Sequence, residues 1–140
     1  MSTTKLKDVF ASDFLIGAAV NPRTIVQSGA LIAAQYNSIT AENEMKFERI
    51  HPQADVYRFE QADQLVGFAR QHGMKMRGHT LVWHNQTPDW LFEGKDGGLT
   101  DKETLYARLK SHIDTVVGRY KNDIYAWDVV NEAVSDEGSN

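Results

Sequence analysis

Three short stretches of the sequence place polar side chains at or just beyond runs that are typical of buried strands. The first stretch follows residues 37–41, the second surrounds the end of residues 74–81, and the third follows residues 124–130. The side chains concerned are Glu42, Asn43, Lys46, His79, Trp83, Gln86, Asn131 and Glu132. Together they include carboxylates, amides, an imidazole, a lysine and an aromatic ring.

This combination of side chains suits the binding and cleavage of a sugar. Aromatic faces stack on the C–H faces of sugar rings, polar groups bond to hydroxyls, and a carboxyl group can transfer a proton. Taken singly, Glu42 and Lys46 could be solvated loop charges, His79 a buried structural histidine, Trp83 a packing residue and Glu132 an exposed strand end. Their joint placement favours a sugar-binding cleft.

The elements that would position these residues alternate along the chain. Apolar runs predict strands at residues 14–20, 37–41, 74–81 and 124–130. Helical periodicity predicts helices at residues 24–36 and 61–72, and a third helix behind a T-x-x-E capping box formed by Thr100 and Glu103. The long segment 82–99 between them is rich in Trp, Pro, Asn and Gly, which indicates a functional loop.

This alternation predicts an α/β fold with a parallel sheet, either an open doubly wound sheet or part of a (β/α)8 TIM barrel. A doubly wound nucleotide-binding domain should carry a glycine-rich phosphate loop after its first strand, but this chain has NPRT there. The barrel is therefore favoured. Its catalytic groups lie beyond the carboxyl ends of the strands, where the polar stretches are found.

Asp128 lies four positions before Glu132 and is expected to point into the barrel. A charge there needs a partner. We expect Arg77, on the same face of the neighbouring strand, to supply it.

Composition excludes several other functions. The 140 residues are 41% apolar with a formal net charge of −4, and charges of both signs are interspersed, so neither nucleic acid nor an anionic membrane is an expected partner. With no cysteine and no H-x-x-x-H spacing among the five histidines, no metal or other cofactor is expected. The N-terminal residues lack the features of a signal peptide, which predicts a cytoplasmic location.

Three motifs resemble the glycoside hydrolases of family 10, which are endo-β-1,4-xylanases with a (β/α)8 barrel. They are ENEMK (residues 42–46), GHTLVWHNQTPDW (78–90) and WDVVNEA (127–133), and together they extend over most of the chain. The resemblance implies that Glu132 is the general acid/base and that Asn131 binds the 2-hydroxyl of the sugar at the cleavage point. It implies further sugar contacts for the remaining residues: Glu42, Asn43 and Lys46 beside the neighbouring sugar, and His79, Trp83 and Gln86 around the cleaved unit.

A complete barrel of this type has about 250 residues. Residues 1–140 are therefore expected to form a single partial domain with about four strands and three helices, without the catalytic nucleophile. The first hypothesis is the N-terminal half of a xylanase, acting on xylan or xylo-oligosaccharides and completed by a C-terminal half-barrel. The second is a non-catalytic sugar-binding half-barrel that self-associates to cover its strand edges. The third is a related β-mannanase or cellulase.

Overall fold

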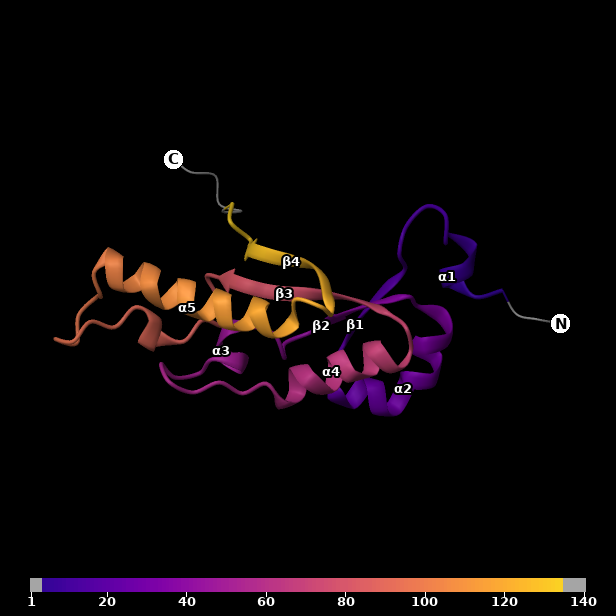
Figure 1. Cartoon of the computed structure of the whole chain (residues 1–140), viewed down its shortest axis with the longest axis horizontal. Coiled ribbons are helices and arrows are strands. Elements are labelled where there is room, and N and C mark those ends of the chain that lie inside the picture. The colour runs from indigo at the N-terminus through magenta and orange to yellow at the C-terminus, as the bar shows by residue number, and fades with distance from the viewer. Residues whose placement is uncertain (1–3, 135–140) are drawn as a thin grey trace.

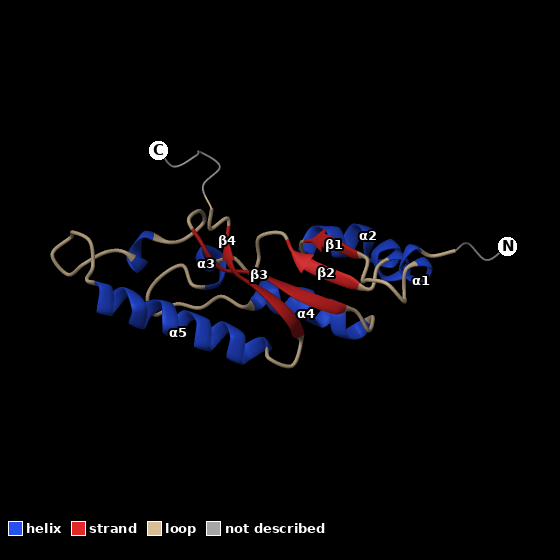
Figure 2. Ribbon diagram, turned by 90° about the horizontal axis from the view of Figure 1, so that it is seen from above, coloured by secondary structure: helices blue, strands red, loops and turns tan. Residues whose placement is uncertain are grey.

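The structure is a computed structural model that describes residues 4–134. Its centre is a sheet of four parallel strands in the order β1 (Gly17–Val20), β2 (Ser38–Ala41), β3 (Lys75–Trp83) and β4 (Ile124–Asn131). Figure 2 shows these strands fanning out in sequence order. The predicted parallel sheet is confirmed.

Three long helices connect the strands: α2 (Pro22–Gln35), α4 (Glu60–Gln71) and α5 (Lys102–Tyr120). They lie on one side of the sheet (Figure 1). Three shorter helices were not predicted, namely α1 (Leu6–Val9), α3 (Phe47–Ile50) and the 3-10 helix η1 (Asp89–Leu91). Among residues 4–134, no helix is both long and apolar enough to cross a membrane.

The core lies between the sheet and these helices. Ile39 of β2 and Met76 of β3 are fully buried, as is Leu65 of α4. The stripe predicted on α4 is buried along its whole length, at Ala62, Leu65, Val66 and Ala69. Each helix that connects two parallel strands buries its apolar face against the sheet. This packing holds the strands in place and hence positions their carboxyl ends.

The predicted capping box of α5 is wrong. Asp101, not Thr100, is the N-cap, and its carboxylate accepts hydrogen bonds from the backbone N of Thr104 at 2.7 Å and from its hydroxyl at 2.8 Å. A carboxylate in this position accepts two hydrogen bonds, and the positive end of the helix dipole stabilises its negative charge. Glu103 therefore lies inside the first turn and is not part of a capping box.

The first strand and the first long helix also differ from the prediction at their boundaries. β1 begins at Gly17 rather than at residue 14, because Phe14 closes a turn with its N–H bonded to the carbonyl of Phe10. Helix α2 begins at Pro22 rather than at residue 24, because Asn21 caps it and proline is well suited to the first helical position.

Candidate active site

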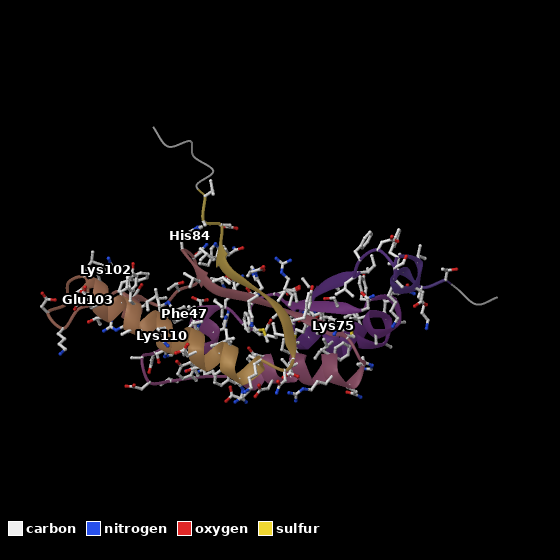
Figure 3. All side chains as sticks on the ribbon, turned by 45° about the horizontal axis from the view of Figure 1, so that its top comes forward. Phe47, Lys75, His84, Lys102, Glu103 and Lys110 are labelled. Atoms are coloured by element: carbon white, nitrogen blue, oxygen red, sulfur yellow. The ribbon has the colours of Figure 1, made fainter. Side chains whose placement is uncertain are left out.

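Most of the candidate residues lie at or beyond the carboxyl ends of the strands. β2 ends at Ala41, immediately before Glu42, and Trp83 and Asn131 are paired as the last residues of β3 and β4. Figure 3 shows His84 at the common end of β3 and β4. The predicted strand-end position holds for Glu42, Trp83, Asn131 and Glu132. It is wrong for His79, which lies in the middle of β3 because this strand continues to Trp83.

Lys46 is the centre of a hydrogen-bonded group at this edge. Its ammonium donates to Oδ1 of Asn43 at 3.0 Å and to Oε1 of Gln86 at 2.6 Å. The same ammonium lies 4.8 Å from the centroid of the Trp83 ring, within the range of a cation–π interaction. Lys46 therefore contacts three other predicted site residues.

Glu132 joins this group through Trp83. The indole N–H of Trp83 donates to Oε2 of Glu132 at 2.8 Å, and Nε2 of His84 lies 3.8 Å from the same oxygen. More than half of the Glu132 side chain (58%) is exposed, so the carboxyl group is open to a ligand. Its backbone has a φ of 51°, a conformation that non-glycine residues rarely adopt and that is concentrated at functional sites.

Glu42 is held by a residue that follows the neighbouring strand, β1. The side-chain amide of Asn21, which follows β1, donates to Oε2 of Glu42 at 2.6 Å. Asn21 was not predicted as a site residue, although it too follows a strand and its Asn-Pro sequence signals a helix N-cap. Applying the strand-end rule to the first strand would have found it.

The expected partnership of Arg77 and Asp128 is confirmed. Arg77 donates to Oδ1 of Asp128 from Nε at 2.9 Å and also from Nη2, and Nδ1 of His79 lies 3.0 Å from Oδ2. Burial alone would raise the pKa of Asp128, but the hydrogen bonds from Arg77 and His79 outweigh it and hold this pKa below its ordinary value. Asp128 is thus an ionised acceptor that fixes the ring of His79.

Two aromatic residues near the polar stretches of the sequence, Phe47 and Trp90, pack in a cluster with His51 and His112. The Phe47 ring stacks on His112 with centroids 3.6 Å apart, and the indole N–H of Trp90 donates to the carbonyl of His51 at 3.1 Å. Figure 3 shows Phe47 beside α5. Trp90 is therefore a packing residue, whereas Trp83 contacts the candidate site.

Among residues 4–134, no three or more His, Asp or Glu side chains are gathered as they would be around a metal ion. The chemistry available at this edge is that of one open carboxyl group beside hydrogen-bond donors and acceptors suited to hydroxyl groups.

Comparison with known proteins identifies the family. Residues 5–140 match the model of glycosyl hydrolase family 10. Endo-1,4-beta-xylanase B of Paenibacillus barcinonensis is 59% identical over 128 residues, which are 91% of this chain and 39% of that protein. Beta-1,4-xylanase of Dictyoglomus thermophilum is 52% identical over 136 residues, 97% of this chain and 37% of that protein.

Solved structures agree. The crystal structure of xylanase XynB from Paenibacillus barcinonensis, complexed with a conduramine derivative, has a TM-score of 0.93 and 57% identity, with 95% of this chain and 40% of that chain covered. Xylanase B from Clostridium stercorarium F9 has a TM-score of 0.90 and 40% identity over 98% of this chain and 44% of that chain. The chain thus spans about 40% of the length of these relatives, with the parallel strands and helices of a partial (β/α)8 barrel. It belongs to glycosyl hydrolase family 10.

Proposed function

We propose that this chain supplies the acid/base half of a retaining endo-1,4-β-xylanase, with Glu132 as general acid/base. The observation that carries the proposal is the position of Glu132. Its carboxyl group lies at the end of β4, bonded to Trp83, whose ring also contacts Lys46. The relatives named above are all xylanases, which favours xylan or xylo-oligosaccharides over mannan or cellulose as the substrate.

The reaction of a retaining glycosidase gives Glu132 two tasks. Its carboxyl group first protonates the glycosidic oxygen as a second carboxylate attacks the anomeric carbon, so that the leaving sugar departs and a covalent glycosyl-enzyme forms. The Glu132 carboxylate then takes a proton from water, which displaces the enzyme carboxylate and releases the sugar with its configuration retained. Asn131, the last residue of β4 and the neighbour of Glu132, would bond a hydroxyl of the cleaved sugar.

The other predicted residues are assigned to sugar binding. Lys46, Asn43 and Glu42 would bond the hydroxyls of the neighbouring sugar, while His79, Trp83 and Gln86 would surround the cleaved unit. The contacts that join Lys46 to Asn43, Gln86 and Trp83 support a role in sugar binding for these residues, because they hold donors and acceptors in fixed positions before a sugar arrives.

The nucleophile is expected from the remaining strands of the barrel, supplied by a C-terminal half that completes this partial domain. The exposed apolar side chains of β4 support such a complement. Tyr125, Val129 and Val130 are each more than half exposed, as expected for a strand whose neighbour lies outside the described residues.

The same exposed side chains favour a second candidate, a sugar-binding module in which two copies of the chain cover each other's strand edges. In that case the contacts around Lys46 would bind xylo-oligosaccharides without cleaving them. Sedimentation of the 140-residue chain measures whether it forms a dimer, and titration with xylobiose measures binding and hydrolysis. A dimer that binds xylobiose and does not hydrolyse it supports the module.

The catalytic proposal is tested with an aryl β-xylobioside. Hydrolysis is measured for the chain alone and for the chain mixed with the C-terminal half of the Paenibacillus barcinonensis xylanase. We expect turnover only in the mixture, and its loss on Glu132→Ala but not on the matched control Glu103→Ala, an exposed glutamate on α5. Turnover by the chain alone that survives Glu132→Ala would disprove the assignment.

Azide isolates the role of Glu132. With a dinitrophenyl leaving group the first step needs little protonation, so Glu132→Ala should slow mainly the second step, in which water must lose a proton. Azide needs no general base, and it should restore turnover with formation of a β-xylobiosyl azide.

Matching aryl β-mannobioside and β-cellobioside substrates test the third hypothesis, a related β-mannanase or cellulase. A preference of the assembled enzyme for either substrate over the xylobioside would support it.

A further inference from the structure

Glu48, a residue outside the predicted site, contacts Gln86 twice. The backbone N–H of Glu48 donates to the carbonyl of Gln86 at 3.0 Å, and the side-chain amide of Gln86 donates from Nε2 to Oε1 of Glu48 at 3.2 Å. Glu48 lies in α3 and Gln86 lies beyond the end of β3, so these bonds join a short helix to the loop that follows β3.

The backbone of Gln86 requires such support. Its φ of 48° lies in the left-handed region, where a side chain other than glycine is disfavoured. Unusual backbone conformations of this kind persist where the surrounding contacts fix them, and they concentrate at functional sites. Gln86 and Glu132 are the two non-glycine residues with positive φ in residues 4–134, and both are at the candidate active site.

Glu48 also determines which end of the Gln86 amide faces Lys46. An ionised carboxylate only accepts hydrogen bonds, so the NH₂ of Gln86 must face Glu48. The amide oxygen then faces the Lys46 ammonium, which donates to it at 2.6 Å. If the amide turned over, its NH₂ would face a cation that can only donate.

The orientation set by Glu48 extends to the sugar contacts. Lys46 is held between Gln86, the side chain of Asn43 and the ring of Trp83. Trp83 in turn donates to Glu132. A continuous set of contacts thus leads from Glu48 through Gln86, Lys46 and Trp83 to the carboxyl group of the proposed acid/base.

From this geometry we infer that Glu48 is a positioning residue, which orients Gln86 and thereby holds Lys46 for the sugar next to the cleaved one. The inference rests on the proposed function for the identity of the ligand. Glu48 itself would not contact the reacting atoms.

The test compares Glu48→Ala, which removes the acceptor, with Glu48→Gln, which retains a carbonyl oxygen for the Gln86 amide. Glu60→Ala is the matched control, because Glu60 is an exposed glutamate that lines the same 300 Å³ hollow as Glu48 and has no recorded bond to Gln86. Each variant is assembled with the C-terminal half of the Paenibacillus barcinonensis xylanase.

Two substrates separate positioning from a general structural effect. An aryl β-xyloside fills only the site of the cleaved sugar, whereas an aryl β-xylobioside also reaches the neighbouring sugar site. Glu48→Ala should lower kcat/KM for the xylobioside by roughly 10-fold, the usual scale for a hydrogen bond to a charged group. The loss for the xyloside should be smaller, because Gln86 also borders the cleaved unit but only the xylobioside reaches Lys46. Glu48→Gln and Glu60→Ala should remain near wild type on both substrates.

Equal losses on both substrates, or no loss in Glu48→Ala, would overturn the inference while leaving the proposed function intact. If the assembled wild type cleaved neither substrate, the proposed function would fail instead. Crystal structures of wild type and Glu48→Ala would then decide the inference alone: displacement of the Gln86 amide from Lys46 supports it, and an unchanged contact refutes it.

Discussion

The indole N–H of Trp83 donates to Oε2 of Glu132 over 2.8 Å, while the face of the same ring lies 4.8 Å from the Lys46 ammonium. The Trp83 side chain therefore contacts both Lys46, which is proposed to bind sugar, and Glu132, the proposed acid/base. The Glu132 side chain is more than half exposed, and its bond to Trp83 is shorter than its 3.8 Å contact with Nε2 of His84.

Trp83→Phe tests the bond, since it keeps an aromatic ring and removes the donor. In the assembled enzyme we expect kcat/KM to fall by about 10- to 100-fold, the range for a hydrogen bond to a charged group. Trp90→Phe is the matched control, because it removes an equivalent indole donor from the carbonyl of His51, away from the strand ends. Equal losses of activity in the two variants would refute a specific role for Trp83.

Gly78 is predicted to tolerate no side chain. A Cβ atom at this position of β3 would lie 2.2 Å from a ring carbon of Trp127, its register partner in β4. Since the Trp127 indole packs against the core, Gly78→Ala should lower the free energy of unfolding by about 1 to 3 kcal/mol, as overpacking does. Urea unfolding measures this change.

Gly118→Ala is the control for the same substitution. Gly118 lies inside α5, and a Cβ there meets nothing within 4 Å. Alanine should stabilise this helix by about 0.5 to 1 kcal/mol. A destabilisation of similar size at both positions would mean that the contact with Trp127 is not the cause.

Asp128→Asn should destabilise the fold by about 1 to 3 kcal/mol, because it removes the charge that accepts from Arg77 and His79. The pKa of Asp128 is lowered in the folded state, so this contribution is fully present above the ordinary aspartate pKa and is lost as the pH falls through the lowered value. Unfolding measured at pH 7 and at pH 3 should therefore differ less in the variant than in wild type. An unchanged stability at pH 7 would show that the three side chains contribute no net stabilisation.

The sequence predicted the order of strands and long helices because apolar periodicity reports burial, and burial here follows from a sheet covered by helices. It predicted boundaries less well. Residue 14 was assigned to a strand from its apolar character, yet Phe14 is 56% exposed and belongs to the turn after α1. Thr100 and Asp101 are both good N-caps, and only the path of the loop before α5 selects Asp101.

The candidate site was predictable to the extent that it follows from strand ends. Local sequence patterns do not encode the contact between Glu48 and Gln86, because these residues are 38 positions apart, one in α3 and the other beyond β3. The same holds for the amide of Asn21 at Glu42, which depends on the pairing of β1 with β2. The partner of Asp128 was predictable, because Arg77 lies on the same face of the neighbouring strand, two residues before His79, which is the register partner of Asp128.

His51 and His112 form a buried neutral pair whose hydrogen bonds fix both rings. Nε2 of His51 lies 2.9 Å from the carbonyl of Ala54, which only accepts, so this nitrogen carries the proton. Nδ1 of His51 must then accept from Nδ1 of His112 at 3.2 Å, which leaves Nε2 of His112 unprotonated. That buried nitrogen has no hydrogen-bond partner among the described residues, so a proton placed on it would also have none.

This arrangement predicts acid lability. Burial, and secondarily the charge of His51, lowers the pKa of His112 to about 3, and burial lowers the pKa of His51 despite its bond to Ala54 and the nearby charge of Asp55. In the unfolded chain both histidines bind protons below about pH 6.5, so the unfolded state is favoured as the pH falls. His112 alone should remove about 2 kcal/mol from the free energy of unfolding between pH 7 and pH 5.

The measurement is urea unfolding at these two pH values for wild type, His112→Asn and His72→Asn. Asparagine at 112 retains an N–H for His51 but does not titrate, so the variant starts less stable and should lose about 2 kcal/mol less between pH 7 and pH 5 than wild type does. His72 is exposed, and its replacement should leave the wild-type pH dependence in place. Most carboxylates remain ionised between pH 5 and pH 7, so they add little to the difference. If His112→Asn lost as much stability as wild type over this range, the buried pair would not be the source of the acid sensitivity.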